Sequence, residues 1–187
     1  MNQSYRHGEI ISKSGELCLA QRIISGIVMI YQEDQSNKHF IRLAITGDII
    51  GIESIYQDVS KFNVIALTNV MCKKVGIDVN NLNLLEEAYI QQQERMLDTA
   101  KLRTSSIADR LGYLIDILAI DIRNSSNTLY RDQLPSLRDM AFIINSVPET
   151  VSRGLSKIIE QKYINSGAVN LKQSLKKYRP ETGRLSI

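Results

Sequence analysis

Glu149 and Arg153 carry the side chains whose types and spacing suggest the most specific chemistry in this chain. They are four residues apart, so on a helix they would lie beside each other on one face. A guanidinium can donate two parallel hydrogen bonds to O6 and N7 of guanine, and a carboxylate can accept one from N4 of cytosine. Thr150 would share this face and could also contact a base. Taken alone, the same spacing favours a surface ion pair, which stabilises a helix by about 0.2–0.5 kcal/mol.

Two short amphipathic helices are predicted to position these side chains. Before the first helix, Ser136 is the expected N-cap, with Asp139 three residues later. The second helix is expected to contain Pro148 in its first turn, where proline is tolerated, and Ser146 with Glu149 has the spacing of a capping box. The apolar faces are Leu137, Met140, Ala141 and Ile144 in the first helix, and Val151, Leu155, Ile158 and Ile159 in the second.

The turn between these helices contains Asn145, where helix-turn-helix geometry usually has a glycine. Asparagine is the residue other than glycine that best accepts a left-handed backbone. Ala141 is small enough for the two helices to cross closely. The segment therefore predicts a helix-turn-helix, whose second helix would lie in the major groove of DNA.

The C-terminal end of the chain is basic. From 131 to 187, ten Lys and Arg accompany five Asp and Glu, a net charge of +5, which leaves −2 for the rest of a chain whose total is +3. DNA binding requires cations near phosphates, because counterion release drives much of the affinity. Ser136, Arg138 and Lys157 are the expected phosphate contacts, which fix register without reading sequence. The basic segment 172–184 is equally consistent with a solvated tail.

The N-terminal half predicts an antiparallel β-roll or barrel. Short runs rich in β-branched residues are separated by glycines and polar turns. With 187 residues and 43% hydrophobic content, the chain can form a sensor-sized domain and a small DNA-binding domain. The expected strands are 23–24, 27–31, 40–45, 49–50, 64–67 and 70–75.

One long helix is predicted from Leu82 to about Arg123, since this stretch has no proline and a single glycine. Its apolar residues recur at alternating steps of three and four, which is the pattern of a seam between helices. The alternative is that the seam packs on the β-roll of the same chain. The polar cluster Asn124–Asn127 is the expected hinge before the helix-turn-helix. The seam comprises Ile90, Leu97, Ala100, Ile107, Leu111, Leu114 and Leu118, diluted by Gln93 and Thr104.

Three stretches resemble the Crp/Fnr family of transcription regulators. Residues 148–164 (PETVSRGLSKIIEQKYI) resemble the family's recognition helix and the following turn. Residues 23–31 (IISGIVMIY) and 47–56 (GDIIGIESIY) resemble two glycine-marked stretches of its N-terminal β-roll. The resemblance implies an α+β chain, in which the leading helix and first strand usual in relatives are expected to be reduced or missing. Its parts would be an antiparallel β-roll of the cyclic-nucleotide-binding jelly-roll type at 1–80, a long dimerisation helix with a hinge at 81–124, and a winged helix-turn-helix at 125–187.

The resemblance also implies a function. The chain would be a regulator that activates or represses promoters by binding a palindromic operator as a homodimer, with RNA polymerase as a further partner. In the family, the residues matching Glu149 and Arg153 contact bases, and those matching Ser136, Arg138 and Thr150 approach phosphates. The long helices of two copies would pair and hold the recognition helices about one DNA turn, ~34 Å, apart.

Cyclic AMP is not expected as the effector. Relatives that bind it hold the phosphate with an Arg-Ser pair and the base with Thr-Ser on the long helix. The matching positions here lie near 60–63 (SKFN) and 95–96 (RM), and they carry neither pair. Lys61 resembles a loop arginine of the nitrogen-control regulators of cyanobacteria and plastids, which sense 2-oxoglutarate. Arg95 and Arg103 would assist it in holding a small anion. The alternative is that all three are exposed cations on a solvated face.

No metal or haem cofactor is expected. The iron–sulfur branch of the family uses four cysteines, and this chain has only Cys18 and Cys72, which are expected to be buried thiols. His7 and His39 fall at a chain end and in a turn, so both are expected at the surface. No apolar run reaches the ~18 residues of a membrane span and no secretory signal is present, so a cytoplasmic location, or a plastid stroma, is expected without a membrane partner.

An enzyme is one alternative, since related β-rolls occur in cupin enzymes. Those sites need clustered histidines and carboxylates, and the chain also has no nucleophile elbow, P-loop or dinucleotide fingerprint. Another alternative is an effector-binding or protein-interaction module with a degenerate DNA-binding domain. Pro148, Gly154 and a wing shortened to Asn165–Asn170 favour that alternative, and a glycine inside a helix costs about 1 kcal/mol relative to alanine.

Overall fold

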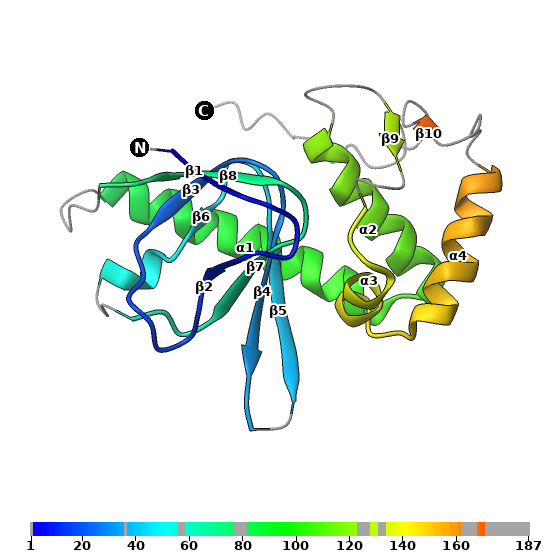
Figure 1. Cartoon of the computed structure of the whole chain (residues 1–187), viewed down its shortest axis with the longest axis horizontal. Helices are drawn as coiled ribbons and strands as arrows, with labels where there is room; N and C mark the ends of the chain where they lie inside the picture. Colours follow the sequence, from blue (N-terminus) through cyan, green and yellow to red (C-terminus); the bar gives the residue numbers. More distant parts are fainter. Residues whose placement is uncertain are drawn as a thin grey trace, which may run out of the picture.

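The computed structural model has an N-terminal β-roll, a helix that runs along the roll, and a group of shorter helices beside both (Figure 1). Within the described part of the chain, no helix is both long and apolar enough to cross a membrane. The residues described are 2–35, 37–55, 59–76, 82–122, 128–130, 134–161 and 168–170, with the backbone alone at 54–55, 82, 120–122, 128–130, 159–161 and 168–170.

Two four-stranded antiparallel sheets form the β-roll, with strand orders β1-β8-β3-β6 and β2-β7-β4-β5. The predicted strands are confirmed as β3 to β8. Strands β1 and β2 were not predicted because their side chains are mostly exposed and do not alternate clearly. The 3-10 helix Ile52–Ile55 follows β6. The strand bounds are β1 Asn2–Tyr5, β2 Ile10–Ser12, β3 Gln21–Ser25, β4 Val28–Glu33, β5 Lys38–Ala44, β6 Ile49–Ile50, β7 Asn63–Ala66 and β8 Val70–Lys74.

Strand β4 is buried on both faces, which explains its unbroken apolar run. Val28 and Ile30 belong to the core inside the roll. Met29 and Tyr31 point to the other side of the sheet and share a second core with the helices. The roll and the helices are therefore joined by apolar packing through this strand.

Gly26 permits the sharp turn from β3 into β4. Its φ of 95° lies in the region that side chains disfavour, and a Cβ there would stand 2.4 Å from the carbonyl oxygen of Asn69. The next residue, Ile27, donates its N–H to Oγ1 of Thr68 (2.9 Å). The glycine thus lets the turn lie directly on the β7–β8 connection.

The single helix predicted from 82 to about 123 is corrected to two helices, α1 (Leu82–Thr104) and α2 (Ile107–Ile122). Ser106 starts the second helix, because its Oγ accepts a hydrogen bond from the N–H of Asp109 (3.2 Å) and donates one to the Asp109 carboxylate (2.6 Å). The hydroxyls of Thr104 and Ser105 donate to carbonyls one turn earlier in α1. Side-chain hydrogen bonds therefore stabilise a helix end and a helix start at this point.

Helix α2 packs with α3 (Leu137–Ile143) and α4 (Pro148–Gln161) beside the roll (Figure 1). Strand β9 (Thr128–Tyr130) pairs antiparallel with β10 (Ala168–Asn170). The hinge predicted at Asn124–Asn127 and the first half of the predicted wing, residues 165–167, lie outside the described residues. The domain boundaries stay predictions, although the core shared by α2, α3 and α4 associates α2 with the two shorter helices.

Candidate nucleic-acid interface

Helix α3 begins at the predicted N-cap. Oγ of Ser136 accepts a hydrogen bond from the N–H of Asp139 (3.1 Å) and donates one to its carboxylate (2.6 Å). At the other end, Nη1 of Arg110 in α2 donates to the carbonyl of Ile144 (2.6 Å), one of the carbonyls that the helix end leaves unpaired. The predicted apolar face is confirmed: Met140, Ala141 and Ile144 are buried and Leu137 is half-buried.

The turn after α3 confirms the role predicted for Asn145, whose φ is 51°. The N–H of Ser146 donates to the carbonyl of Ala141 (2.8 Å), which closes α3 in the manner of a Schellman motif. Val147 is the residue that precedes α4, and its carbonyl accepts from the N–H of Val151 (3.2 Å). The backbone N–H of Ser146 thus belongs to the end of α3, and the capping box predicted for its side chain with Glu149 stays a prediction, whereas Pro148 in the first turn of α4 is confirmed.

The inward face of α4 anchors it in the core. Val151 and Leu155 are buried and Ile158 is half-buried against the same core. Gly154 faces α2, and a Cβ at this position would stand 2.7 Å from Cδ2 of Leu111. The glycine that favoured a degenerate domain therefore has a packing reason, since it lets α4 approach α2 closely.

The outward face of α4 carries the predicted reading residues. Glu149, Arg153 and Lys157 are exposed and Thr150 is half-buried. Within the described part of the chain, no ion pair joins Glu149 to Arg153, although their spacing would allow one. Arg138 in the first turn of α3 is exposed as well. The structure thus presents two cations and a carboxylate along one side of α4, opposite its buried stripe.

The three cations predicted for an effector have different surroundings. Lys61 is exposed before β7. The Arg95 side chain is only 13% exposed, so it does not lie on a solvated face, and it forms ion pairs with carboxylates of the chain itself. The Arg103 guanidinium lies 5.0 Å from the ring centroid of Phe40 and lines a cavity of about 360 Å³ with the turn residue Asn145. Their joint effector role stays a prediction.

A polar face of α1, which was not predicted, binds this helix to the roll. Both Nη atoms of Arg22 in β3 donate to the carboxylate of Glu87 (2.5 and 2.7 Å), and this contact holds the pKa of Glu87 below its ordinary value. One turn later, Gln91 accepts from the N–H of Ile49 (2.9 Å) and donates to the carbonyl of Gly47 (3.1 Å). The side chains of α1 thus fasten it to the turn that precedes β6.

The same polar face continues along α1. Nε of Arg95 lies 3.2 Å from a carboxylate oxygen of Asp48, and Oγ1 of Thr99 donates to the carbonyl of Ile41 (3.3 Å). Burial raises the pKa of Asp48, although its own turn and nearby arginines counter this. The sequence signal was available, because the four contact residues of α1 recur at every fourth position: Glu87, Gln91, Arg95 and Thr99.

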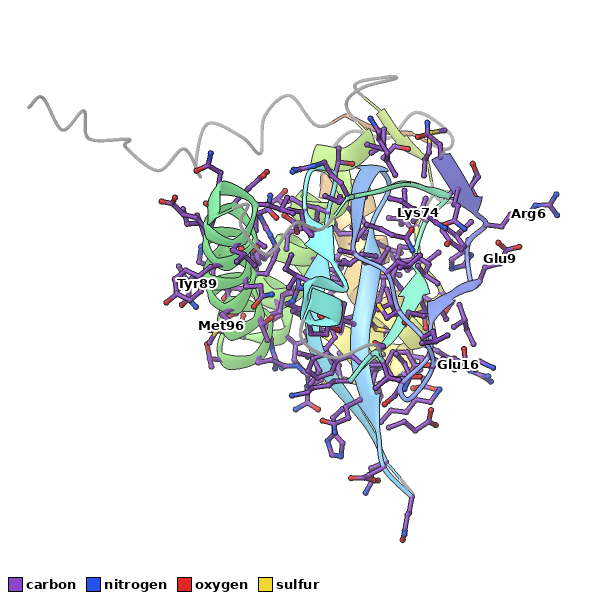
Figure 2. The ribbon with its side chains drawn as sticks, turned by 90° about the vertical axis from the view of Figure 1, so that its left-hand side faces the viewer. Arg6, Glu9, Glu16, Lys74, Tyr89 and Met96 are labelled. Atoms are coloured by element: carbon purple, nitrogen blue, oxygen red, sulfur yellow. The ribbon has the colours of Figure 1, made fainter. Side chains whose placement is uncertain are left out.

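The opposite face of α1 is apolar and exposed. Figure 2 shows Tyr89 and Met96 pointing away from the sheets, and these side chains are 64% and 60% exposed. Ile90 and Leu97 are 49% and 66% exposed beside them. Helix α1 therefore contacts its own chain through polar side chains and through the buried Leu84, Ala88 and Leu102, while part of its other face exposes apolar side chains to solvent. The predicted seam is divided accordingly, since its later residues Leu111, Leu114 and Leu118 are buried in the chain's own core.

An aromatic contact joins the β4–β5 hairpin to α3. The rings of Phe40 and Phe142 meet edge to face, with centroids 6.4 Å apart and an interplanar angle of 86°. Arg103 covers the same Phe40 ring. The helices that carry the predicted reading residues are thus placed against the roll by specific side chains.

Cys18 and Cys72 are buried free thiols, as predicted, and burial raises the pKa of Cys72 to about 11. His7 and His39 are exposed, as predicted, and Nε2 of His39 lies 3.1 Å from Asp34. Among the described residues, no group of three or more His, Cys, Asp or Glu side chains is arranged to hold a metal ion.

Comparisons with known proteins find no matching family profile and no matching curated protein, but they do find structural neighbours. TTHB099, a Crp-family transcriptional regulator of Thermus thermophilus, matches with a TM-score of 0.70 at 18% identity, over 90% of this chain and 91% of that one. FixK2 of Bradyrhizobium japonicum matches with 0.67 at 20% identity, over 91% of each chain. TTHA1359, a Crp/Fnr-family regulator of Thermus thermophilus, matches with 0.60 at 19% identity, over 92% and 95%.

The chain therefore has a Crp/Fnr-like fold of antiparallel sheets and helices, and its structural neighbours are transcription regulators of that family. At these identities the likeness shows the fold. Nothing in the comparisons supports the nitrogen-control branch to which Lys61 pointed.

Proposed function

We propose that this chain is a sequence-specific transcription regulator of the Crp/Fnr type, which binds a palindromic DNA operator as a homodimer through α4. The observation that carries the proposal is the outward face of α4. Glu149 and Arg153 are exposed there without pairing to each other, while Val151 and Leu155 hold the helix in the core. The fold shared with regulators supports the same conclusion.

In this proposal each polar residue of the interface has a distinct task. Arg153 donates two hydrogen bonds to a guanine, and Glu149 accepts one from a neighbouring cytosine. Thr150, half-buried between them and the core, contacts a base or the adjacent phosphate. Arg138 and Lys157 neutralise phosphates. Ser136 already uses its hydroxyl to cap α3, so a phosphate contact from this residue would compete with the cap.

The exposed apolar residues of α1 support the homodimer. A helix that exposes Tyr89, Ile90, Met96 and Leu97 leaves a long apolar stripe in water, and such stripes mark interaction surfaces. The heptad spacing of Ile90, Leu97 and Ala100 suits an identical helix related by a two-fold axis. Paired α1 helices would place the two α4 helices on successive major grooves, ~34 Å apart.

Two finer features belong to the same proposal. The β9–β10 ribbon serves as the wing beside α3 and α4, and RNA polymerase is the partner through which promoter occupancy acts on transcription. Cyclic AMP is not the effector in this proposal. Arg95, at one of the positions matched to the base-contacting residues of cyclic-AMP-binding relatives, is instead paired to Asp48 and Asp98.

The decisive experiment is selection of bound sequences from a random pool of double-stranded DNA by the purified chain. Enrichment of a two-fold symmetric site supports the proposal, and selection repeated with cyclic AMP or 2-oxoglutarate tests each molecule as an effector. Failure to enrich any sequence at low salt, where phosphate contacts are strongest, contradicts it and favours the protein-interaction module.

A further inference from the structure

Tyr113 bridges the joint between α1 and α2. Its hydroxyl donates to Oδ1 of Asp98 in α1 (2.5 Å), and Nζ of Lys101 lies 3.5 Å from the Tyr113 hydroxyl oxygen and 5.0 Å from the centroid of its ring. The backbone link is only Ser105 and Ser106, between the last residue of one helix and the first of the next. A two-residue connection does not by itself fix the angle between two helices, so side chains that cross it act together with the core that α2 shares with α1 and the roll.

Asp98 is itself held on the side away from Tyr113. Its second carboxylate oxygen forms an ion pair with Nη1 of Arg95, and Nε of Arg95 lies 3.2 Å from Asp48 in the turn before β6. Asp48 also accepts a hydrogen bond from the N–H of Ile45 (2.9 Å). The Arg95, Asp98 and Asp48 side chains are 13%, 15% and 6% exposed, so the contacts are shielded from solvent.

On its other side, α2 carries the recognition helix. Leu111 lies against Gly154 of α4, and Leu114, one residue after Tyr113, is fully buried in the core that α2 shares with α3 and α4. Close-packed helices move together rather than deforming. A rotation of α2 about the joint would therefore carry Glu149 and Arg153 with it.

We propose that Tyr113 is a positioning residue, which sets the angle between α1 and the α2–α4 helices. Asp98 holds its hydroxyl, and Arg95 in turn links Asp98 to Asp48. The inference rests on the proposed function for its consequence: in a dimer joined through α1, this angle fixes the distance between the two recognition helices. Tyr113 thereby determines which half-site spacing the dimer accepts. Its hydroxyl contacts no base and does not affect which bases are read.

The test compares the wild-type chain with Tyr113→Phe, which keeps the ring and removes the hydroxyl. Tyr5→Phe is the matched control, because Tyr5 lies in β1 of the roll and its hydroxyl donates a long bond to Gln3 of the same strand (3.4 Å). Binding is measured to operators whose half-sites are moved apart or together by one base pair, which changes both their separation and their relative rotation. Hydrogen exchange of the backbone amides at 104–110 is measured in the same proteins without DNA.

We expect the wild type and Tyr5→Phe to bind the shifted operators about tenfold more weakly than the selected one. In Tyr113→Phe this difference falls below about threefold, the preferred half-site sequence is unchanged, and exchange at 104–110 is about tenfold faster. An unchanged spacing preference in Tyr113→Phe overturns the inference while leaving the proposed function intact. If the wild type selects no DNA sequence, the proposed function fails. In that case, unchanged exchange at 104–110 in Tyr113→Phe also overturns the role of Tyr113 at the joint. Faster exchange in this variant supports that role.

Discussion

Gly154 of α4 lies against Leu111 of α2 so closely that a Cβ on residue 154 would stand 2.7 Å from Cδ2 of the leucine. Leu111 is 1% exposed, so its side chain has no solvent space into which it can turn. A glycine inside a helix costs about 1 kcal/mol relative to alanine. The close approach of the two helices explains why this position nevertheless carries one.

Gly154→Ala is therefore expected to lower the free energy of unfolding by about 1 kcal/mol, because overpacking a core by one methyl group costs about 1–3 kcal/mol and exceeds the gain in helix propensity. Gly112→Ala in α2 is the matched control, since a Cβ there meets no atom within 4 Å. That variant should be more stable than the wild type by up to about 1 kcal/mol. Urea denaturation measures both, and equal stabilisation by the two substitutions would contradict the close contact.

Arg153→Ala is expected to lose discrimination at one base pair of each half-site, at a cost of about 1–3 kcal/mol, because it removes two donors to a guanine. Competition between the selected operator and single-base variants measures this loss. The dimer should be unaffected, since the side chain is exposed on α4. A variant that still prefers the same base at every position would refute the assignment.

Arg138→Ala is expected to weaken binding to all sequences alike and to reduce the slope of log affinity against log salt by about 1, as the loss of a phosphate contact does. Arg6→Ala is the control of equal charge change, because Arg6 lies on the side of the roll away from α1 in Figure 2. Titrations at several salt concentrations compare the three proteins. Equal slopes for Arg138→Ala and the wild type would exclude the phosphate role.

Leu97→Glu is expected to convert the dimer into monomers, because a charge on the exposed seam of α1 would be desolvated against its copy in the partner helix. Leu97 is 66% exposed within the chain, so the folded monomer itself should tolerate the change. Leu17→Glu is the matched control on the roll, where Leu17 is 84% exposed. Sedimentation velocity reports the oligomeric state, and a dimer that survives Leu97→Glu would show that another surface joins the copies.

The ion pair between Arg22 and Glu87 predicts an acid-sensitive attachment of α1 to the roll. The contact lowers the pKa of Glu87 in the folded chain, so its stabilisation is fully present above the ordinary carboxyl value of 4.5 and is lost as the pH falls through the lowered value. Glu87→Gln should therefore have a lower melting temperature than the wild type at about pH 7. Between about pH 7 and about pH 3 its melting temperature should fall less than that of the wild type, because the variant has no ion pair at this position to lose. Glu16→Gln, in an exposed pair with Lys13, should match the wild type at both values.

Much of the local structure was predictable because its causes are local. The β-branched runs between glycines became β3 to β8, and Ser136 caps α3 as its spacing to Asp139 predicts. The left-handed backbone of Asn145 was predictable because asparagine is one of the few residues other than glycine that accept it. The start of α2 had an equally local signal in Ser106 and Asp109, but the continuous apolar seam obscured it.

The remaining features depend on partners that are distant in the chain. Periodicity showed that α1 has two faces but not which one faces inward, and Arg95 meets Asp48 only after the roll has formed. In the sequence, Gly154 favoured a degenerate helix, and only its contact with Leu111 in the structure gives the glycine a packing reason. The sequence by itself determined strands β3 to β8, the Ser136 cap of α3 and the residue types on α4, because hydrogen bonds and side-chain periods act over a few residues. Only the tertiary structure decided that α1 leaves Ile90, Met96 and Leu97 exposed and that Tyr113 spans the joint, because burial and charge pairing are settled between segments rather than within them.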